Sequence, residues 1–480
     1  MDEAAKVQVV VFPLPLPLVG HLVPTVELAK LLLGHRSLLS ITILTPHDHP
    51  FNPSSTAPYI ERTSSSSFPL NRLRFLQLPR VDFSPAPDMR PQTLFSLFAA
   101  AHKPIVTETL KSLSSTSPPV CAFIIDFFCT ALLDAAMESG VPAYIFFTSS
   151  ANSLALMLHL PTLHDQIPCE FKDCKEPIIV PGLPPVPPID LPLVLSDKTN
   201  DAYKWFLYNS RRFHQAKGIL INTFLDLETR SLDALHKGIC LSDHPSPPVY
   251  PVGPLLNLDE YQTSAGEHHK CLQWLDKQPQ DSVVFLCFGS LGTLSNRQTK
   301  QVALGLEQSG HRFLWSLRGP TSMDQLFDTK DAELRDLLPE GFLERTHDLG
   351  MVWPKWAPQA AVLAHPAVGA FVSHCGWNST LESVWFGVPM VAWPLYAEQR
   401  LNALELVREV GVALELKMEE DGWVKAEELE RVARRLMEGD EGKIVRKRVK
   451  ELKEASTKVL EEGGSSYASL ASAIHRILKG

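Results

Sequence analysis

The chain has 480 residues, of which 45% are hydrophobic and 21% are charged. This balance is typical of a globular protein with a large core and excludes disorder as the main state. The net charge of −9 argues against a nucleic-acid-binding protein, which needs a basic face. Of the 39 prolines, 31 lie in residues 1–254. Because each proline fixes φ and removes a backbone donor, the proline-rich half cannot consist of regular helix and sheet alone. We infer that the two halves are separate domains with different roles, which the length permits.

The first half of the chain alternates short apolar runs with segments of helical spacing. Residues Val7–Phe12 predict a strand buried on both faces, Leu22–Leu33 a helix closed by Gly34, and Leu39–Leu44 a second strand. The alternation continues with a strand, a helix and a strand at 120–127, 129–139 and 143–147. The pattern predicts a parallel α/β sheet.

Two long stretches, 46–91 and 168–200, break this alternation. The second contains Pro181–Pro188, whose prolines exclude a helix or a central strand. Loops of this length inside a compact domain are usually functional. We therefore expect them to form walls and lids of a pocket.

No segment predicts a membrane span or a secretory signal. The most apolar candidate, Val141–Leu160, contains Pro142 and several polar residues, so a strand followed by a helix explains it better. The N-terminus opens with Asp2 and Glu3 instead of a positive region. The eight cysteines form no Cys-x-x-Cys pair and no zinc spacing, which indicates buried thiols in a reducing compartment. We expect a cytoplasmic protein.

The second half restarts the alternation of strands and helices. Residues Ser282–Phe288 predict a strand, Gly289–Gly292 a turn, and Ser295 with Gln298 a capping box for a helix that reaches Gln308. Further strands are predicted at 313–317, 368–372, 390–393 and 412–416, and charged surface helices at 424–437, 441–461 and 466–478. Open α/β domains bind ligands outside the carboxyl ends of their strands. Two such domains predict a cleft between those ends.

Polar and aromatic side chains gather after one of these strands. A helix is predicted to begin near Asn378, and a strand–glycine–helix junction offers free N–H groups and a positive helix end to a phosphate. His374 and Ser379 add donors there, Glu382 is placed to accept from a ribose hydroxyl, and Trp356 to stack on a base. Two further polar side chains end the following strand, Glu398 and Gln399. A helix cap, a structural histidine and a packed tryptophan would explain the pieces singly. Their occurrence in one 44-residue window favours a ligand site.

The window Trp356–Gln399 closely resembles the signature box of plant secondary-product UDP-glycosyltransferases. The resemblance extends to Gly20 with His21, to the turn at 288–290 and to the overall length. It implies the GT-B architecture, an α/β fold of two Rossmann-like parallel-sheet domains that face each other across a cleft. The expected organisation is an acceptor-binding domain, a linker, a UDP-sugar-binding domain and a C-terminal helix that returns to the first domain, at 1–252, 253–268, 269–458 and 459–480.

The resemblance also implies roles for single residues. Three surround the uracil and the ribose: Trp356, which stacks on the base, Ala357 and Gln359. Glu382 would hold the ribose hydroxyls. Four bind the diphosphate: Ser290, His374, Asn378 and Ser379. Three contact the sugar: Trp377, Glu398 and Gln399. A glutamine at position 399 goes with glucose in this family, whereas the glutamate at 398 replaces the commoner aspartate and blurs that assignment slightly.

In the first half, His21 and Asp126 each follow a predicted strand of one sheet and are expected to meet. The family places its catalytic base in a Pro-x-x-Gly-His pattern, which Pro17–His21 fits. A neutral imidazole takes the proton of an acceptor hydroxyl as it attacks, and a carboxylate behind the ring fixes the tautomer. Attack opposite the UDP inverts the anomeric centre, without a second carboxylate as nucleophile. A helix cap and an ordinary acidic residue after a strand are the simpler explanations of the two side chains.

The proline-rich half is expected to supply the acceptor pocket. Its candidate walls are Leu18, Phe128, Thr148, Leu191, Tyr203 and Trp205, with contact to the glucose as the alternative for Thr148. Such a lining suits a flat phenolic or terpenoid molecule. No Asp-x-Asp pair is present to hold a divalent ion, so we expect no metal requirement.

The sequence therefore predicts a monomeric, inverting glucosyltransferase that uses UDP-glucose. Its acceptor would be a small lipophilic molecule such as a flavonoid, with no bound cofactor and no nucleic-acid partner. One alternative is a C-glycosyltransferase, because the same base can activate a phenol whose ring carbon attacks. Another is a UDP-sugar-binding protein without turnover, which the intact pair of His21 and Asp126 disfavours.

Overall fold

The computed structural model describes residues 7–14, 19–36, 38–46, 59–61, 63, 72–86, 89–116, 118–258, 270–318, 334–355, 357–419 and 421–479. The chain divides into two compact units. The first consists of Met1–Leu255 together with Val459–Gly480, and the second of Leu256–Lys458. The predicted linker at 253–268 lies largely outside the described residues.

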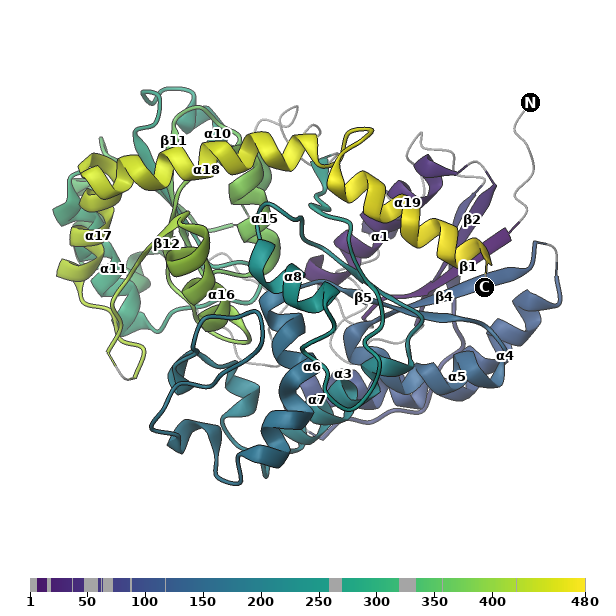
Figure 1. Ribbon diagram of the computed structural model, residues 1–480. Coiled ribbons are helices and arrows are strands. Elements are labelled where there is room, and N and C mark those ends of the chain that lie inside the picture. Colours follow the sequence, from purple (N-terminus) through teal and green to yellow (C-terminus); the bar gives the residue numbers. More distant parts are fainter. Residues whose placement is uncertain are drawn as a thin grey trace. The chain divides into compact units, whose positions relative to one another are not determined.

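The first unit is built on a parallel sheet of seven strands in the order β3-β2-β1-β4-β5-β6-β7 (Figure 1). The strands are β1 (Val7–Phe12), β2 (Leu39–Thr45), β3 (Leu73–Gln77), β4 (Val120–Asp126), β5 (Ala143–Phe147), β6 (Ile219–Ile221) and β7 (Val249–Pro251). The central strands are buried almost completely, as expected for a parallel sheet covered on both faces. The reversal of strand order between β1 and β4 is typical of a Rossmann-like sheet.

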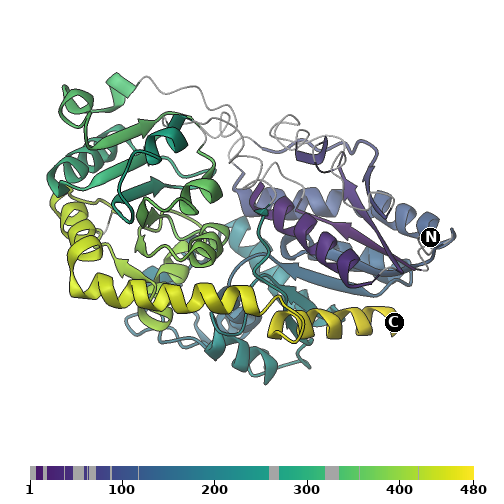
Figure 2. The ribbon, with the colours of Figure 1, turned by 90° about the horizontal axis from the view of Figure 1, so that it is seen from above.

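Helices cover this sheet on both sides. They are α1 (Val19–His35), α3 (Pro91–Ala101), α4 (Lys103–Ser114), α5 (Leu133–Glu138), α6 (Ala151–Gln166), α7 (Asp201–Arg212), α8 (Thr229–His236) and α19 (Ser465–Lys479), with short 3-10 turns η1 (Phe127–Leu132), η2 (Phe171–Asp173), η3 (Pro188–Asp190), η4 (Leu193–Leu195) and η5 (Phe213–Gln215). The last helix, α19, lies beside α1 in both ribbon views (Figure 2). Its Leu470, Ile474 and Ile477 belong to the same core cluster as β1, and Ser466 Oγ donates to the carbonyl of Gly253 at 2.6 Å.

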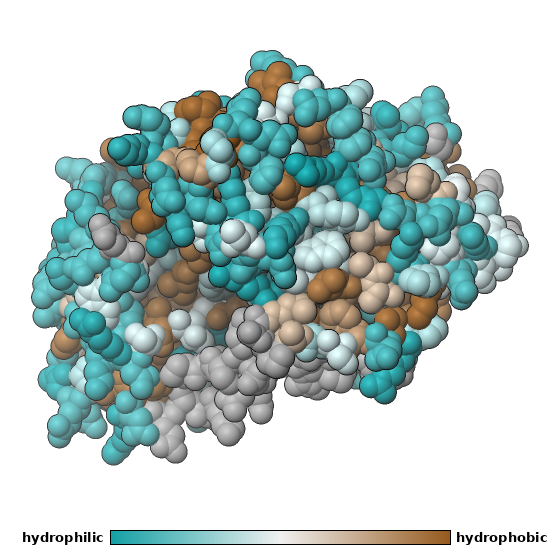
Figure 3. Space-filling model, turned by 90° about the horizontal axis from the view of Figure 1, so that it is seen from below, coloured by the Kyte–Doolittle hydropathy of each residue, from teal (hydrophilic) through white to brown (hydrophobic). Residues whose placement is uncertain are grey.

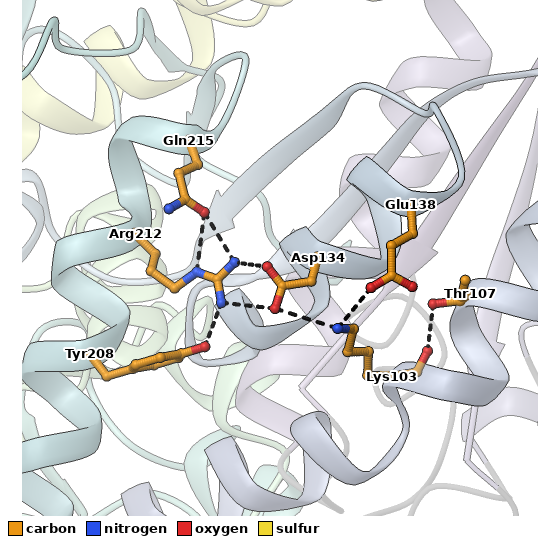
Figure 4. Close-up of polar contacts among 7 residues, drawn as sticks. All are labelled: Lys103, Thr107, Asp134, Glu138, Tyr208, Arg212 and Gln215. Carbon is orange, nitrogen blue, oxygen red and sulfur yellow. Dashed lines mark hydrogen bonds and ion pairs between the residues drawn. The ribbon is translucent and has the colours of Figure 1, made fainter.

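A charged network joins α4, α5 and α7 on the surface of the first unit (Figure 4). Arg212, at the end of α7, pairs with Asp134 of α5 and donates to Tyr208. Lys103 of α4 lies 3.7 Å from Asp134 and 2.9 Å from Glu138. The Arg212 guanidinium holds the pKa of Asp134 below its usual value. The network fixes α7 against the helices that cover the sheet.

The second unit contains a parallel sheet of six strands in the order β10-β9-β8-β11-β12-β13. The strands are β8 (Val283–Cys287), β9 (Arg312–Ser316), β10 (Gly350–Trp353), β11 (Val368–Ser373), β12 (Met390–Ala392) and β13 (Ala413–Glu415). The helices are α10 (Lys270–Leu275), α11 (Asn296–Ser309), α12 (Leu334–Leu337), α13 (Phe342–Arg345), α14 (Gln359–Leu363), α15 (Trp377–Phe386), α16 (Gln399–Glu405), the π-helical η7 (Leu406–Val410), α17 (Ala426–Glu438) and α18 (Asp440–Lys458).

Basic residues of α18 cap the carboxyl ends of other helices in the second unit. Arg446 donates to the carbonyl of Leu436 at 2.6 Å and so caps α17, while Arg448 donates to Val410 at the end of η7 at 3.1 Å. Lys453 donates to Phe386 at the end of α15 at 3.1 Å. Each cation donates to a carbonyl in the last turn of a helix and meets the negative end of the helix dipole. One helix thus completes three others.

The strands that were predicted agree with the structure to within one or two residues, and four strands were missed. Two of them, β6 and β7, are buried but have only three residues each, which is too short for an apolar run to stand out. β3 falls in the stretch 46–91, which was predicted to be loop, and β10 had no prediction. Both lie at the outer edge of their sheets and are only partly buried. An edge strand faces solvent on one side. β3 (LRFLQ) therefore mixes polar and apolar residues, and β10 (GMVW) is apolar but only four residues long. The predicted helix 129–139 is split into η1 and α5.

The predicted capping box is half formed. Ser295 Oγ accepts from the backbone N–H of Gln298 at 3.2 Å. The Gln298 side chain does not return to the cap, because it bonds the backbone N–H and carbonyl of Val424 instead. Tertiary contacts therefore took over the second half of a local motif.

Two further expectations concern membrane spans and the burial of the cysteines. The face drawn in Figure 3 is mostly hydrophilic, with hydrophobic side chains in scattered patches. Within the described ranges, every helix is too short or too polar to cross a membrane. The prediction that the thiols are buried is wrong for Cys169, which is exposed. Its Sγ atom lies 3.8 Å from the Sγ atom of Cys174.

Candidate functional site

The first unit brings His21 and Asp126 into direct contact. His21 lies in the first turns of α1, after β1, and Asp126 is the last residue of β4, the neighbouring strand. His21 Nδ1 is 2.7 Å from Asp126 Oδ2. The other carboxylate oxygen accepts the backbone N–H of Phe128 at 3.0 Å. Both carboxylate oxygens are thus engaged, which fixes the carboxylate behind the imidazole.

The exposure of the pair suits an imidazole that works on a ligand. The Asp126 side chain is fully buried, whereas the His21 side chain is 19% exposed. Thr148 Oγ1, just after β5, lies 3.0 Å from the same Nδ1 atom. When Nδ1 carries the proton and donates it to Asp126, Nε2 has a free lone pair and can accept a proton.

Aromatic rings surround the imidazole of His21. The rings of Phe127 and Phe128 in η1 lie 5.8 and 6.2 Å from it, centroid to centroid. Phe128 also contacts Phe95 of α3 and Phe206 of α7. Of this group, only Phe128 was predicted from the sequence. The pair of phenylalanines directly after Asp126 was the available signal for Phe127, whereas Phe95 and Phe206 are brought in by the packing of α3 and α7.

The other predicted acceptor residues have different environments. Tyr203 of α7 is 1% exposed, and its hydroxyl lies 2.7 Å from His164 Nδ1. Burial raises the pKa of Tyr203, so its hydroxyl stays protonated. Trp205 is half-buried and packs edge-on against Tyr208. Leu191, after η3, is buried. Leu18 lies outside the described residues.

In the second unit, β11 runs into the tight segment His374–Gly376 before α15 begins at Trp377. The His374 ring is 5% exposed and is held against two glycines. A Cβ atom at Gly289 or Gly376 would lie 2.5 or 2.4 Å from His374 Nε2. Burial, with a smaller effect from the charge of Arg318, lowers the pKa of His374 to about 4. The imidazole is therefore neutral at pH 7.

One nitrogen of this neutral ring is free to serve a ligand. His374 Nδ1 is buried and has no hydrogen-bond partner among the residues that the structure describes. Buried polar atoms are nearly always satisfied, so an unsatisfied one beside the amino end of a ten-residue helix indicates a place for an anion.

A side-chain network connects the start of α14 with the start of α15. Gln359 Nε2 donates to Glu382 Oε2 at 2.7 Å and to Ser379 Oγ at 2.9 Å. Three residues that were predicted one by one are thus neighbours in the structure. Ala357, just before this network, is buried, and Trp356 lies outside the described residues.

The turn between β12 and α16 carries the remaining predicted residues. Gln399 is 3% exposed, and its side-chain oxygen accepts the backbone N–H groups of Leu395 and Tyr396, both at 2.9 Å. Only the amide NH₂ group of Gln399 can therefore face a ligand. Glu398 is the residue before α16. Trp377 and Asn378 open α15, where the former is buried and the latter half-buried.

The Gly289–Gly292 turn holds Ser290 and contacts a residue that the sequence analysis missed. Arg318, two residues after β9, donates to the carbonyls of Ser290 at 2.6 Å and of Gly292 at 3.4 Å, and also to that of Gly289. Burial lowers the pKa of Arg318. A basic residue just after a buried strand was the only signal for it in the sequence.

In the part of the chain that the structure describes, no group of three or more His, Cys, Asp or Glu side chains is arranged to hold a metal ion. The expectation that the protein needs no metal remains a prediction.

Comparison with known proteins places this geometry in a family. Residues 245–443 match the family of UDP-glucoronosyl and UDP-glucosyl transferases. The chain is 43% identical over 468 residues to anthocyanidin 5,3-O-glucosyltransferase of a Rosa hybrid cultivar, covering 95% of this chain and 96% of the relative. It is similar to a UDP-glucosyltransferase of Polygonum tinctorium that glucosylates indoxyl, with a TM-score of 0.87, 40% identity and 98% of each chain covered.

A third relative was solved with a sugar donor. UGT71G1 of Medicago truncatula, in complex with UDP-glucose, has a TM-score of 0.83 and 37% identity, with 98% of each chain covered. Identities of this size over nearly the whole length confirm the resemblance of the signature box and the GT-B type of the two Rossmann-like sheets. The chain belongs to the plant secondary-product UDP-glycosyltransferase family and is a UDP-sugar-dependent glycosyltransferase.

Proposed function

We propose that the protein transfers glucose from UDP-glucose to a hydroxyl group of a phenolic acceptor such as a flavonoid, with inversion at the anomeric carbon. The observation that carries this proposal is the contact between His21 Nδ1 and Asp126 Oδ2 at 2.7 Å. Names of two relatives, an anthocyanidin glucosyltransferase and an indoxyl-glucosylating enzyme, support the acceptor class.

In the proposed reaction, His21 is the general base. Its Nδ1–H donates to Asp126, and Nε2 removes the proton of the acceptor hydroxyl as that oxygen attacks the anomeric carbon. The new C–O bond forms while the bond to the UDP oxygen breaks, and UDP leaves with the electron pair. The Asp126 carboxylate stabilises the imidazolium that results. Attack opposite the leaving group converts an α-linked donor into a β-glucoside.

The second unit supplies the donor contacts in this proposal. The amino end of α15, His374, Asn378, Ser379 and the Ser290 turn would bind the diphosphate with neutral donors. Trp356 would stack on the uracil beside Ala357, while Gln359 and Glu382, which bond each other, would meet the ribose. Trp377, Glu398 and the Gln399 amide would contact the glucose. The UDP-glucose complex of the Medicago truncatula relative supports this donor.

The acceptor contacts in the proposal come from the first unit. Phe128 and Trp205 would line the pocket, Leu18 and Leu191 would add apolar contacts, and Tyr203 would support the wall. Thr148, which contacts the same His21 nitrogen as Asp126, would meet the attacking hydroxyl or the transferred sugar. Aromatic lining suits a flat ring system.

The test is incubation of the purified protein with UDP-glucose or UDP-galactose and a panel of flavonoids, simple phenols and terpenoids. We expect a β-O-glucoside from the phenolic acceptors, identified by mass and by the coupling of the anomeric proton. A product that resists acid hydrolysis would indicate a C-glycoside. Binding of UDP without any product would indicate a non-catalytic binding protein, and a product from UDP-galactose alone would overturn the donor.

The base is tested by His21→Ala. We expect this variant to bind UDP like the wild type and to lose transfer, because His21 serves the acceptor and not the nucleotide. The control is His347→Ala, since His347 is exposed and pairs with its neighbour Asp348 on the surface. Unchanged turnover in His21→Ala would contradict the mechanism.

A further inference from the structure

The Gly289–Gly292 turn is organised by a cation on its inner side. The Arg318 guanidinium donates to the carbonyl oxygens of Gly289, Ser290 and Gly292. Arginine alone among the side chains offers five donors in a rigid fork, so it can gather several carbonyls at once. Among the described residues, no carboxylate pairs with Arg318. The carbonyls of the turn are its partners there.

The contacts of Arg318 determine where the N–H groups of the turn point. A trans peptide is planar, and its carbonyl and N–H point in opposite directions. Carbonyls of residues 289, 290 and 292 that face the guanidinium therefore turn the N–H groups of Ser290, Leu291 and Thr293 to the opposite side. Gly289 has a φ of 72°, in the left-handed region. A left-handed residue within a turn is a feature of backbone concavities that bind anions.

The same turn contacts the other anion-binding elements of the second unit. The Gly289 backbone lies against the His374 ring, whose Nδ1 atom is buried without a partner among the described residues. The ring precedes the amino end of α15. Arg318 also acts on His374 through space, because its positive charge disfavours protonation of the imidazole. One cation thus orients the turn and helps to keep the histidine neutral.

We propose that Arg318 is a positioning residue for the diphosphate of the sugar donor. It acts through the turn 289–292, whose N–H groups it directs toward the phosphates beside the His374 ring that the Gly289 backbone contacts. The inference rests on the proposed function, in which this turn and His374 bind the diphosphate.

The test measures the binding of uridine, UMP and UDP by titration calorimetry. The variants are Arg318→Met, which removes the donors, and Arg318→Lys, which keeps the charge but not the fork. We expect uridine to bind each variant within about twofold of the wild type, and UDP to bind Arg318→Met about tenfold or more weakly, the loss of one hydrogen bond to a charged group. Arg318→Lys should bind UDP more weakly than the wild type but more tightly than Arg318→Met, because one ammonium cannot gather three carbonyls.

A second readout separates positioning from a merely structural role. With ¹³C-labelled histidine, the NMR titration of His374 in Arg318→Met should show a pKa above that of the wild type, because the nearby positive charge is gone. The matched control is Arg312→Met at the start of β9, where Arg312 bonds Gln278 at 3.1 Å. This control should leave both the UDP-to-uridine affinity ratio and the His374 titration unchanged.

Each outcome decides between explanations. Equal weakening of uridine and UDP in both variants would overturn the inference in favour of general stability, and so would an unchanged UDP affinity in Arg318→Met. If Arg318→Met does not fold, the ratio measured with Arg318→Lys decides. Failure of the wild type itself to bind UDP would contradict the proposed function, which is a result distinct from any change in the variants.

Discussion

Replacing Asp126 by asparagine should disable the base while leaving its shape in place. One carboxylate oxygen of Asp126 faces His21 Nδ1 at 2.7 Å and the other accepts the Phe128 N–H at 3.0 Å. An asparagine offers one oxygen and one NH₂ group. If the oxygen stays on Phe128, the NH₂ group faces Nδ1 and favours the tautomer with the proton on Nε2, which can no longer accept one. If the amide flips, two donors meet at Phe128.

The size of this effect follows from the role of the pair. General base catalysis contributes about 10²–10⁴-fold to the rate, so kcat for Asp126→Asn should fall by this factor. The fall corresponds to a rise of about 3 to 5 kcal/mol in the activation barrier. One mismatched buried hydrogen bond should cost about 1–3 kcal/mol of unfolding free energy. UDP release gives kcat, calorimetry with UDP shows whether the donor site is intact, and urea unfolding gives stability.

The matched control is Asp233→Asn, an exposed carboxylate of the same unit that pairs with Lys237 at 2.6 Å. It should keep kcat within about twofold, since an exposed pair contributes little. A kcat for Asp126→Asn within threefold of the wild type, with UDP binding intact, would refute the assignment of His21 as a base oriented by Asp126.

Three further predictions concern the second unit and the reaction conditions. In Gly376→Ala the new Cβ would lie 2.4 Å from His374 Nε2. This overpacking should lower the free energy of unfolding by about 1–3 kcal/mol and weaken UDP binding. The control Gly34→Ala has open space at its Cβ in α1 and should raise the free energy of unfolding by about 0.5–1 kcal/mol. His374 has a pKa of about 4 in the folded protein and about 6.5 in the unfolded chain. Between these pH values the unfolded chain binds a proton that the folded protein does not, so stability falls as the pH is lowered through this window. At pH 5, urea unfolding should show a loss of about 2 kcal/mol from this group, and the loss should be absent in His374→Gln. Turnover should persist in excess chelator, and its complete loss would show that a metal is needed.

The strands that the sequence predicted well are the ones buried on both faces. β1, β4, β5, β8 and β11 each appear as a continuous apolar run, because a parallel sheet covered by helices excludes water from both sides. The edge strand β3 mixes polar and apolar residues and β10 is only four residues long, so their pairing with β2 and β9 is what defines them. A local pattern cannot report a hydrogen-bonded neighbour that is distant in sequence.

The candidate site shows the same division. His21 and Asp126 were predicted to meet because both follow strands, and the structure brings them together. The neutral state of His374 could not be predicted, since it depends on burial. The contacts of Arg318 could not be predicted, since they involve a turn 28 residues earlier in the chain. The contact of the Tyr203 hydroxyl with His164 could not be predicted from the sequence either, because it depends on how α6 and α7 pack.

The return of α19 to the first unit has a consequence for how the protein is made. Leu470, Ile474 and Ile477 complete a core whose other members lie in residues 7–255. The ribosome synthesises that part first, yet its core lacks one helix until residues 465–479 have been translated. The second unit, 256–458, has no such dependence. A premature stop near residue 460 would therefore damage the half of the protein that was synthesised earliest, and the later half would be the better able to fold during translation.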